Sequence, residues 1–320
     1  VSAEWDNPYM TMSYDFEARI AKECGEFAIN NDMYIGKKPI HWCCSCKTAL
    51  AEAEIEYANV TSPSVYVKFP ITSGPFEKIG AAFLVWTTTP WTLVSNTAIA
   101  VHPDVTYVLA ESENEKLIVA EDLLSSLGDC FTVTQKISGR ELEHTKYHRP
   151  FDWVEIPDAH FVVLAEYVTT TDGTGLVHQS PAFGADDLQV CRKYNLPVVN
   201  PIMGDGTFEK SIPLVAGMFF KEADKPLVKE LKSHGLLFKQ QNYEHSYPHC
   251  WRCHTPLMYY AQPSWYIRTT AIKDALLREN EKTDWHPSTI KTGRYGDWLE
   301  NNIDWALSRN RYWGTPLPIW

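Results

Sequence analysis

The chain has 320 residues, of which 44% are hydrophobic and 22% charged, and its formal net charge is −11. This composition excludes a disordered or collagen-like chain, and the length predicts about two domains. No apolar run approaches the ~20 residues that a membrane helix needs, so we expect no membrane partner. The acidic balance argues against a protein that coats nucleic acid non-specifically, because phosphate binding needs many Lys and Arg.

Both ends of the sequence predict that the chain is a piece of a larger protein. It begins without Met, and it stops inside an apolar run, Pro316–Trp320, that predicts a strand. The start, Val1–Met10, lacks the apolar stretch of a signal peptide. Three isolated cysteines, Cys24, Cys130 and Cys191, predict small buried apolar residues and not a disulfide scaffold. A large core without an export signal predicts a cytoplasmic location.

The first predicted element is a helix over Tyr14–Asn31, because its apolar residues can share one face. Strict alternation over Glu52–Tyr57 predicts a half-buried strand. Strands separated by Pro, Gly, Asn and Asp follow at Ser64–Phe69, Ala81–Thr88, Thr97–Val101, Thr106–Glu111, Leu117–Ala120, His160–Thr169 and Leu176–His178. Further helices are predicted at Glu121–Leu127, Asp186–Tyr194, Asp224–His234 (with Pro226 in its first turn), Thr270–Lys282 and Ser288–Asn302.

The composition changes near Tyr243, since seven of the 12 Trp lie from Trp251 onward. We therefore predict three parts: residues 1–46, a strand-rich globule at 47–240 and residues 241–320. The globule is predicted to be a barrel-like β domain, so the fold class is α+β and rich in strands. The two flanks are expected to belong together, because each carries one C-x-x-C pair.

These two pairs, Cys43/Cys46 and Cys250/Cys253, predict a metal site. Each C-x-x-C turn can aim both sulfurs at one ion, and two such turns supply four thiolates for tetrahedral zinc. Four protein ligands leave no open position, so the zinc would be structural. The alternative is four unrelated reduced thiols. Four neighbours could replace one of the ligands: His41, Cys44, His249 and His254.

A run of hydroxyl residues, Trp86-Thr-Thr-Thr-Pro-Trp-Thr-Leu93, follows a predicted strand and precedes Asn96. Thr87 and Thr89 should point to one face and Thr88 to the other. Such a run is common at strand ends for its β propensity alone. It could also form a small, stiff pocket wall whose branched methyl groups limit the size of a bound side chain.

A second string, Gly173-Thr-Gly-Leu-Val-His-Gln-Ser-Pro-Ala-Phe-Gly-Ala-Asp-Asp187, joins a strand end to a helix start. One of the carboxylates, Asp186 or Asp187, is expected to cap the helix or to interact with its dipole. The other could hold a ligand ammonium, because helix N–H donors would keep its pKa low. A lone His178 is more often structural than catalytic.

These two strings resemble the editing domain of the isoleucyl-tRNA synthetase family. Related valyl and leucyl enzymes usually carry Arg in place of the third Thr, so Thr89 favours the isoleucyl group. Nearly the whole chain shares the resemblance, through His41–Tyr57, Tyr247–Cys253, Ser264–Ile267 and Trp305–Pro318. One difference is Ala182-Phe183-Gly184, where many bacterial members have a second His in a Gly-His-Gly stretch.

The resemblance implies a fold in which a valyl/isoleucyl/leucyl-type editing domain is inserted in a Rossmann-type catalytic domain and flanked by zinc-ribbon-like segments. The family's HIGH and KMSKS motifs are missing from this sequence, so we expect it not to activate an amino acid. ATP and magnesium would then be cofactors of a full-length enzyme only. Ser308–Trp313 would belong to the edge of the synthetic site.

The implied activity is hydrolysis of mischarged Val-tRNA(Ile) by water, with isoleucine excluded by size. One methylene is discriminated by only ~1–3 kcal/mol in binding, a limit for which isoleucyl-tRNA synthetases are the standard example. Asp187 would hold the substrate ammonium and His178 would line the valine pocket. The remaining pocket and terminal-adenosine contacts would come from Trp86, Thr87, Thr88, Thr89, Thr92, Asn96 and Gly175. The implied partner is the aminoacyl 3′ end of tRNA(Ile), and no oligomer is expected.

Three alternatives stay open at this point. The chain could be a tRNA-docking module without catalysis, in which the Thr run and Asp187 are structural. It could be a zinc-ribbon interaction domain without ester chemistry. It could also be the editing domain of the related valyl enzyme.

Overall fold

The computed structural model describes residues 4–310 and 314–319. The chain divides into two compact units: residues 38–261, and a second unit built from the residues up to 37 and from 262 onward. The boundaries predicted from the sequence, near residues 46 and 240, assign the C-x-x-C pairs to the flanks. Both pairs lie within the unit 38–261, and the predicted domain boundaries stay a prediction.

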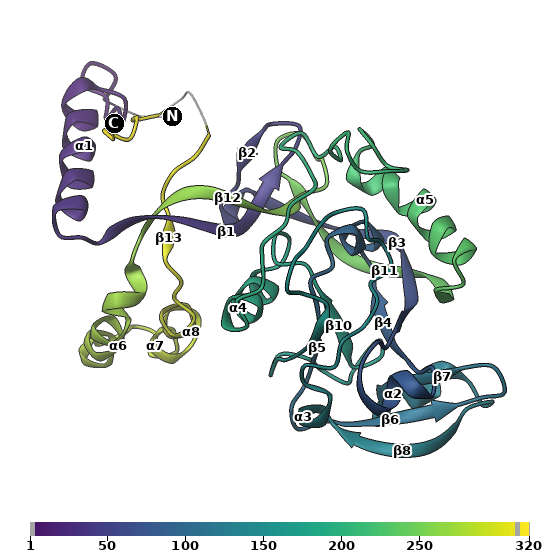
Figure 1. The fold of residues 1–320 in the computed structure, drawn as a ribbon. Helices are drawn as coiled ribbons and strands as arrows, with labels where there is room; N and C mark the ends of the chain where they lie inside the picture. The colour runs from purple at the N-terminus through teal and green to yellow at the C-terminus, as the bar shows by residue number, and fades with distance from the viewer. Residues whose placement is uncertain (1–3, 311–313, 320) are drawn as a thin grey trace. The chain divides into compact units, whose positions relative to one another are not determined.

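The largest sheet of the unit 38–261 has six strands in the order β11-β3-β4-β7-β6-β8 (Figure 1). All pairings are antiparallel except that of β4 with β7. Its strands are β3 (Ile55–Pro70), β4 (Ala82–Thr87), β6 (Thr106–Glu111), β7 (Lys116–Ala120), β8 (Thr132–Ser138) and β11 (Leu237–Cys250).

A smaller sheet, β10-β5-β9, adjoins the first one where β10 contacts β4. β5 (Ala98–Val101) is the central strand and is fully buried, which explains its continuous run of Ala, Ile and Val. It pairs in parallel with β9 (Phe161–Leu164) and antiparallel with β10 (Leu176–Gln179). The two adjoining sheets confirm the predicted α+β class, rich in strands.

Short helices connect these strands and cover the sheets. Helix α5 packs beside β11 and β3 (Figure 1). Five short helices and two longer ones belong to this unit: η1 (Glu52–Glu54), α2 (Gly74–Lys78), η2 (Pro90–Ser95), η3 (Glu121–Leu127), α3 (Gly139–Leu142), α4 (Ala185–Lys193) and α5 (Phe220–Ser233).

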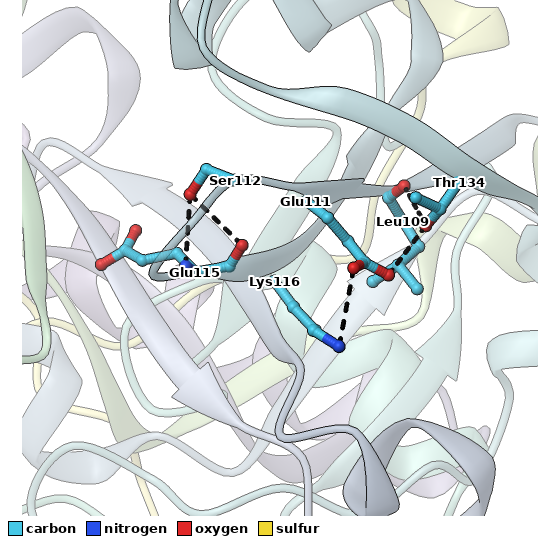
Figure 2. A network of polar contacts seen from close by, with 6 residues as sticks. All are labelled: Leu109, Glu111, Ser112, Glu115, Lys116 and Thr134. Carbon is cyan, nitrogen blue, oxygen red and sulfur yellow. Dashed lines mark hydrogen bonds and ion pairs between the residues drawn. The ribbon is translucent and has the colours of Figure 1, made fainter.

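Figure 2 shows a polar network that ties the β6–β7 hairpin to β8. Ser112 and Glu115 exchange hydrogen bonds across the turn, and Lys116 forms an ion pair with Glu111 at 3.5 Å. Thr134 is the extra residue of a bulge in β8, and its hydroxyl contacts Glu111 and the backbone oxygen of Leu109. The bulge interrupts the strand pairing at this point, and the Thr134 hydroxyl supplies the Leu109 carbonyl with a hydrogen-bond partner.

The second unit is mainly helical, and within it the end of β12 pairs antiparallel with β13, with Tyr266 opposite Ala306. Its elements are α1 (Tyr14–Ile29), η4 (Thr269–Ile272), α6 (Lys273–Lys282), α7 (Thr289–Thr292), α8 (Arg294–Glu300) and β13 (Trp305–Ala306). Two strands continue from one unit into the other, β1 (Met33–Cys43) and β12 (Met258–Ile267). β2 (Thr48–Ala49) pairs with the end of β1. No helix in the described ranges is long and apolar enough to cross a membrane.

Most predicted elements are confirmed, and the errors have local causes. Glu52–Tyr57 begins as a 3₁₀ turn and not as a strand, because the Glu54 carboxylate accepts the N–H of Ala51. α5 starts four residues before Asp224, since Phe220 and Ala223 are buried on its apolar face, and Pro226 therefore lies inside the helix. The predicted strand at His160–Thr169 ends at Leu164.

Gly293 divides the predicted helix Ser288–Asn302 into α7 and α8. Residues 316–319 form no strand, contrary to the prediction for Pro316–Trp320, and Trp320 lies outside the described residues. Positions 311–313 of the predicted segment Ser308–Trp313 also lie outside them.

Candidate functional site

The Thr run lies at the junction of β4 and η2. β4 ends at Thr87, and Pro90 starts the 3₁₀ helix after Thr89. The Oγ1 of Thr87 accepts the N–H of Thr89 at 3.1 Å and lies 3.2 Å from the Thr89 hydroxyl, which confirms that these two side chains share a face. Thr88 is half-buried and makes no side-chain hydrogen bond within the described part of the chain.

A buried network extends from the Thr run to β10. The hydroxyls of Thr89 and Thr92 lie 3.3 Å apart, and Thr92 donates to the backbone oxygen of Thr89 at 2.8 Å. The Oγ1 of Thr92 also lies 2.7 Å from Nε2 of His178. Four members of this network lie at most 7% exposed: Thr87, Thr92, Asn96 and His178. We call these four residues and Thr89 the Thr–His network.

Asn96 determines the protonation of the His178 ring. Its Nδ2 lies 3.0 Å from the backbone oxygen of Ala98, which can only accept, and 3.3 Å from Nδ1 of His178. Nδ1 therefore accepts, and a neutral ring carries its proton on Nε2, which donates to Thr92. Tyr147 completes the arrangement, because its hydroxyl donates to Oδ1 of Asn96 at 2.7 Å.

His178 is thereby unsuited to act as a general base. Complete burial lowers the pKa of its imidazole to about 4, so the ring is neutral at physiological pH. Both ring nitrogens already have partners within the protein, so no lone pair faces a reacting water. The ring can line a pocket and hold Thr92 in place, and contact with a substrate stays a prediction.

Asp187 sits in the first turn of α4, whose N-cap is Gly184. Its carboxylate accepts the N–H of Ser180 at 2.7 Å. A Cβ at Gly184 would come within 2.7 Å of the Asp187 carboxyl carbon, so glycine leaves room for this side chain. Ser180 in turn lies 2.8 Å from Ser95 through the two hydroxyls, which links the start of α4 to η2.

One expectation about the acidic pair is met and another needs correction. Neither carboxylate belongs to the N-cap residue, which is Gly184, but both lie in the first turn of α4, where the helix dipole favours them, and Asp186 is exposed there. The pKa of Asp187 is not low: burial raises it to about 6, against the opposing effect of the Ser180 N–H. The side chain is still mostly ionised at neutral pH.

The remaining predicted contacts, Trp86 and Gly175, lie outside the hydrogen-bonded network. Trp86 is half-buried and packs edge-on to Tyr243, and its indole nitrogen has no hydrogen-bond partner among the described residues. Gly175 (φ +75°) begins the approach to β10, and a Cβ there would come within 2.4 Å of Ala120. Substrate contacts by Trp86, Thr88 and Gly175 stay predictions.

Sequence reasoning did not find Tyr147, Ser95, Ser180 or Asp224. Tyr147 lies in a loop without periodicity, and the two serines look like ordinary turn residues, so nothing in the sequence marked them. Asp224 had a signal: it lies on the face of α5 that carries Leu227, Val228 and Leu231, where a carboxylate is unusual.

The four predicted cysteines come together at one point of the unit 38–261. Their sulfurs all lie within 4.8 Å of one another, with Cys43 and Cys46 at 3.4 and 3.6 Å from Cys253. Tetrahedral zinc with Zn–S bonds of about 2.3 Å places its sulfurs about 3.8 Å apart. The N–H of Cys46 also points at the sulfur of Cys43 at 3.3 Å. The donor set and its geometry therefore fit one tetrahedral metal ion.

The electrostatics of the cluster also suit a cation. Burial raises the pKa of the Cys43 thiol, whereas at Cys253 the effect of burial is outweighed by hydrogen bonds with Thr255, Cys43 and Cys250, which together lower its pKa to about 6. One thiolate thus forms readily, and a bound cation would favour deprotonation of the others. The neighbouring His254 is exposed, with its Nδ1 3.2 Å from the Glu56 carboxylate, and it lies outside this four-sulfur group.

Comparison with known proteins gives the family. The model of the class I tRNA synthetases (I, L, M and V) matches residues 1–320. The chain belongs to this family. It is 60% identical over 323 aligned residues to isoleucine–tRNA ligase of Streptomyces coelicolor, covering 99% of the chain and 31% of the relative. Identity to the ligase of Thermobifida fusca is 65% over 284 residues, covering 87% and 27%. The chain thus spans about a third of these relatives.

A weaker likeness exists to the editing domain of cytosolic leucyl-tRNA synthetase from P. knowlesi. The TM-score is 0.44 at 12% identity, covering 57% of this chain and 97% of that one. That value is too low to carry an argument from one structure to the other.

Proposed function

We propose that this chain hydrolyses mischarged Val-tRNA(Ile), with water attacking the aminoacyl ester. The observation that carries the proposal is the Thr–His network, a buried and neutral set of hydrogen-bonded groups, to which three hydrogen bonds connect Asp187 through Ser180, Ser95 and the backbone oxygen of Thr92. High identity to isoleucine–tRNA ligases over 99% of the chain supports the amino acid and the tRNA.

Asp187 would bind the α-ammonium of the substrate. The carboxylate is half-buried, and a cation in the same place would offset the burial that raises its pKa. An aminoacyl ester has a free ammonium, whereas a peptidyl or acetylated ester has none. This contact would therefore select aminoacyl esters.

The Thr wall would set the size limit. Thr87 and Thr89 are locked by hydrogen bonds to each other and to the backbone, so their methyl groups have fixed positions. A fixed methyl group opposes one extra methylene at little entropic cost, which is how isoleucine would be refused. Thr92 has its hydroxyl hydrogen and both lone pairs engaged, so Thr89 donates its hydroxyl hydrogen to Thr92, and Thr87 donates to Thr89. Thr87 and Thr89 each keep one lone pair that would accept a hydrogen bond from the attacking water.

Zinc would be structural, held by Cys43, Cys46, Cys250 and Cys253, and would bring the two C-x-x-C turns together. Thiolate ligands need a reducing compartment, which supports a cytoplasmic location. ATP and magnesium would serve only the synthetic reaction of a full-length ligase.

The decisive experiment compares hydrolysis of Val-tRNA(Ile) and Ile-tRNA(Ile) by the protein, with tRNA binding measured in parallel. We expect release of valine well above the spontaneous rate and little release of isoleucine. Binding without hydrolysis would favour a docking module. Preferential hydrolysis of Thr-tRNA(Val) would favour the valyl alternative.

A further inference from the structure

A buried carboxylate lies behind the Thr run, on a different element. Asp224 is 4% exposed and belongs to the apolar face of α5, beside the buried side chains of Leu227 and Val228. A carboxylate in such a place is costly unless it is hydrogen-bonded. The hydrogen-bond partner of the Asp224 carboxylate therefore indicates the role of this residue.

That partner is the backbone N–H of Trp91, 3.0 Å from Oδ1 of Asp224 and 133 residues away in the sequence. Pro90 has no N–H, so the N–H of Trp91 is the first donor that η2 presents. The N-cap residue Thr89 makes no side-chain capping bond of its own. Asp224 thus caps the turn that carries Thr92, and it does so from α5.

The Trp91 side chain reinforces this docking. Its ring packs edge-on to Phe220 of α5 and to Phe183, with both centroid distances 4.8 Å. Phe183 lies in the loop between His178 and Asp187. Trp91 of η2 is therefore held at its backbone by Asp224 and at its ring by Phe220 and Phe183.

The charged and titratable groups around Asp224 are few. Lys221 lies one turn earlier on α5 and places its Nζ 3.9 Å from the ring centre of Tyr247 on β11. His245 lies on the same strand and faces Lys221. Burial raises the pKa of Asp224 to about 7, and Lys221 and the Trp91 N–H oppose that shift. Asp224 therefore changes charge near neutral pH while keeping an acceptor oxygen in either state.

We propose that Asp224 is a positioning residue for the Thr–His network, which acts by fixing the start of η2 through the Trp91 N–H. Loss of the acceptor would let η2 shift, and Thr89 and Thr92 would move relative to His178. The inference rests on the proposed deacylation for its kinetic readout only.

The test compares Asp224→Ala, which loses the acceptor, with Asp224→Asn, which keeps an oxygen for the Trp91 N–H. Glu222→Ala, an exposed acidic residue of the same helix, is the matched control. Asp224→Leu keeps the branching pattern of the aspartate side chain, with larger methyl groups in place of the two oxygens and therefore no acceptor, and it replaces the alanine variant should that one not fold. Two readouts are taken: deacylation of Val-tRNA(Ile) and Ile-tRNA(Ile), and NMR signals of the Trp91 amide and the His178 ring.

We expect at least tenfold slower valine release and weaker Val/Ile discrimination in Asp224→Ala or Asp224→Leu, with shifted His178 signals. Asp224→Asn should recover to within threefold of wild type, and Glu222→Ala should be unchanged. A folded variant without the acceptor but with wild-type rates and wild-type His178 signals would overturn the inference. If the wild-type protein releases no valine while the His178 signals shift only in the variants without the acceptor, the positioning role stands and the proposed function fails.

Discussion

Asn96 donates its amide N–H to Nδ1 of His178 and thereby fixes the proton of the imidazole on Nε2. The orientation of the amide follows from its second contact, the carbonyl of Ala98, and the Tyr147 hydroxyl completes it. Each hydrogen bond in this series therefore has one direction, from Tyr147 through Asn96 and His178 to Thr92. The hydroxyl groups of the Thr–His network are thereby held in fixed positions without any charge.

The first prediction concerns the ionisation of His178. We expect the neutral Nε2–H form throughout the range in which the protein is folded, down to pH near 4, because burial disfavours the imidazolium. Nitrogen-15 NMR of the ring distinguishes the two tautomers and the cation directly. The exposed His286 provides a reference ring in the same sample. An Nδ1–H tautomer, or a cation at pH 6, would contradict the assigned direction of the network.

The second prediction concerns the size limit. Shortening Thr87, Thr88, Thr89 or His178 to Ala should, at one position at least, allow isoleucine release or reduce Val/Ile discrimination by roughly 1–3 kcal/mol, the worth of one methylene. At the three Thr positions, Thr→Val is the matched control, because it retains the branched shape and loses only the hydroxyl. The measurement is the ratio of valine to isoleucine release from charged tRNA(Ile). Unchanged rejection of isoleucine in all four Ala variants would place the limiting wall elsewhere.

The third prediction concerns the pH dependence of stability at Asp224. The pKa is 3.8 for an ordinary Asp and about 7 in the folded protein, so the folded state holds this proton more tightly. Stability from this group is present at low pH and is lost as pH rises from about 4 to about 7. Asp224→Asn removes the penalty and keeps the acceptor. We expect it to stabilise the protein at pH 8 by up to about 4 kcal/mol and to change little at pH 4. Urea unfolding at the two pH values measures this difference, and an equal effect at both would contradict it.

The fourth prediction is one zinc ion per chain, bound by Cys43, Cys46, Cys250 and Cys253. Cys253→Ser should lose the metal and lower stability by about 2–3 kcal/mol, or roughly 5–10 °C in Tm. Cys130→Ser is the control, because Cys130 is exposed and far from the cluster in sequence. Metal analysis of protein purified without chelator is the measurement. Protein free of zinc, or equal zinc content in the Cys253 variant, would refute the site.

The sequence predicts what is local or repeated in this molecule. The matched C-x-x-C turns predicted the cysteine cluster, and the Thr run predicted a shared face for Thr87 and Thr89, because both patterns need only short-range geometry. The sequence does not predict which residues distant in the chain form hydrogen bonds with one another. Tyr147 and Asp224 act through hydrogen bonds to residues 51 and 133 positions away, and no period or spacing encodes such contacts. Likewise the raised pKa of Asp187 follows from burial, which the sequence pattern of a helix start does not reveal.

The last prediction concerns Asp187 in the proposed reaction. Asp187→Ala removes the group that would bind the ammonium, and loss of one partner of a desolvated charge pair costs roughly 2–5 kcal/mol, at least about thirtyfold in valine release. Asp186→Ala is the matched control: its side chain is exposed and caps nothing, so we expect near wild-type release and a stability change within about 0.5 kcal/mol.

Only ionised Asp187 attracts the ammonium, and its pKa in the free protein is about 6. In the wild type, kcat/KM for valine release should therefore fall about tenfold per pH unit below 6, and it should fall again above about pH 8 as the α-ammonium of the substrate deprotonates. A folded Asp187→Ala variant with normal valine release, or a wild-type profile that is level down to pH 5, would remove Asp187 from the reaction.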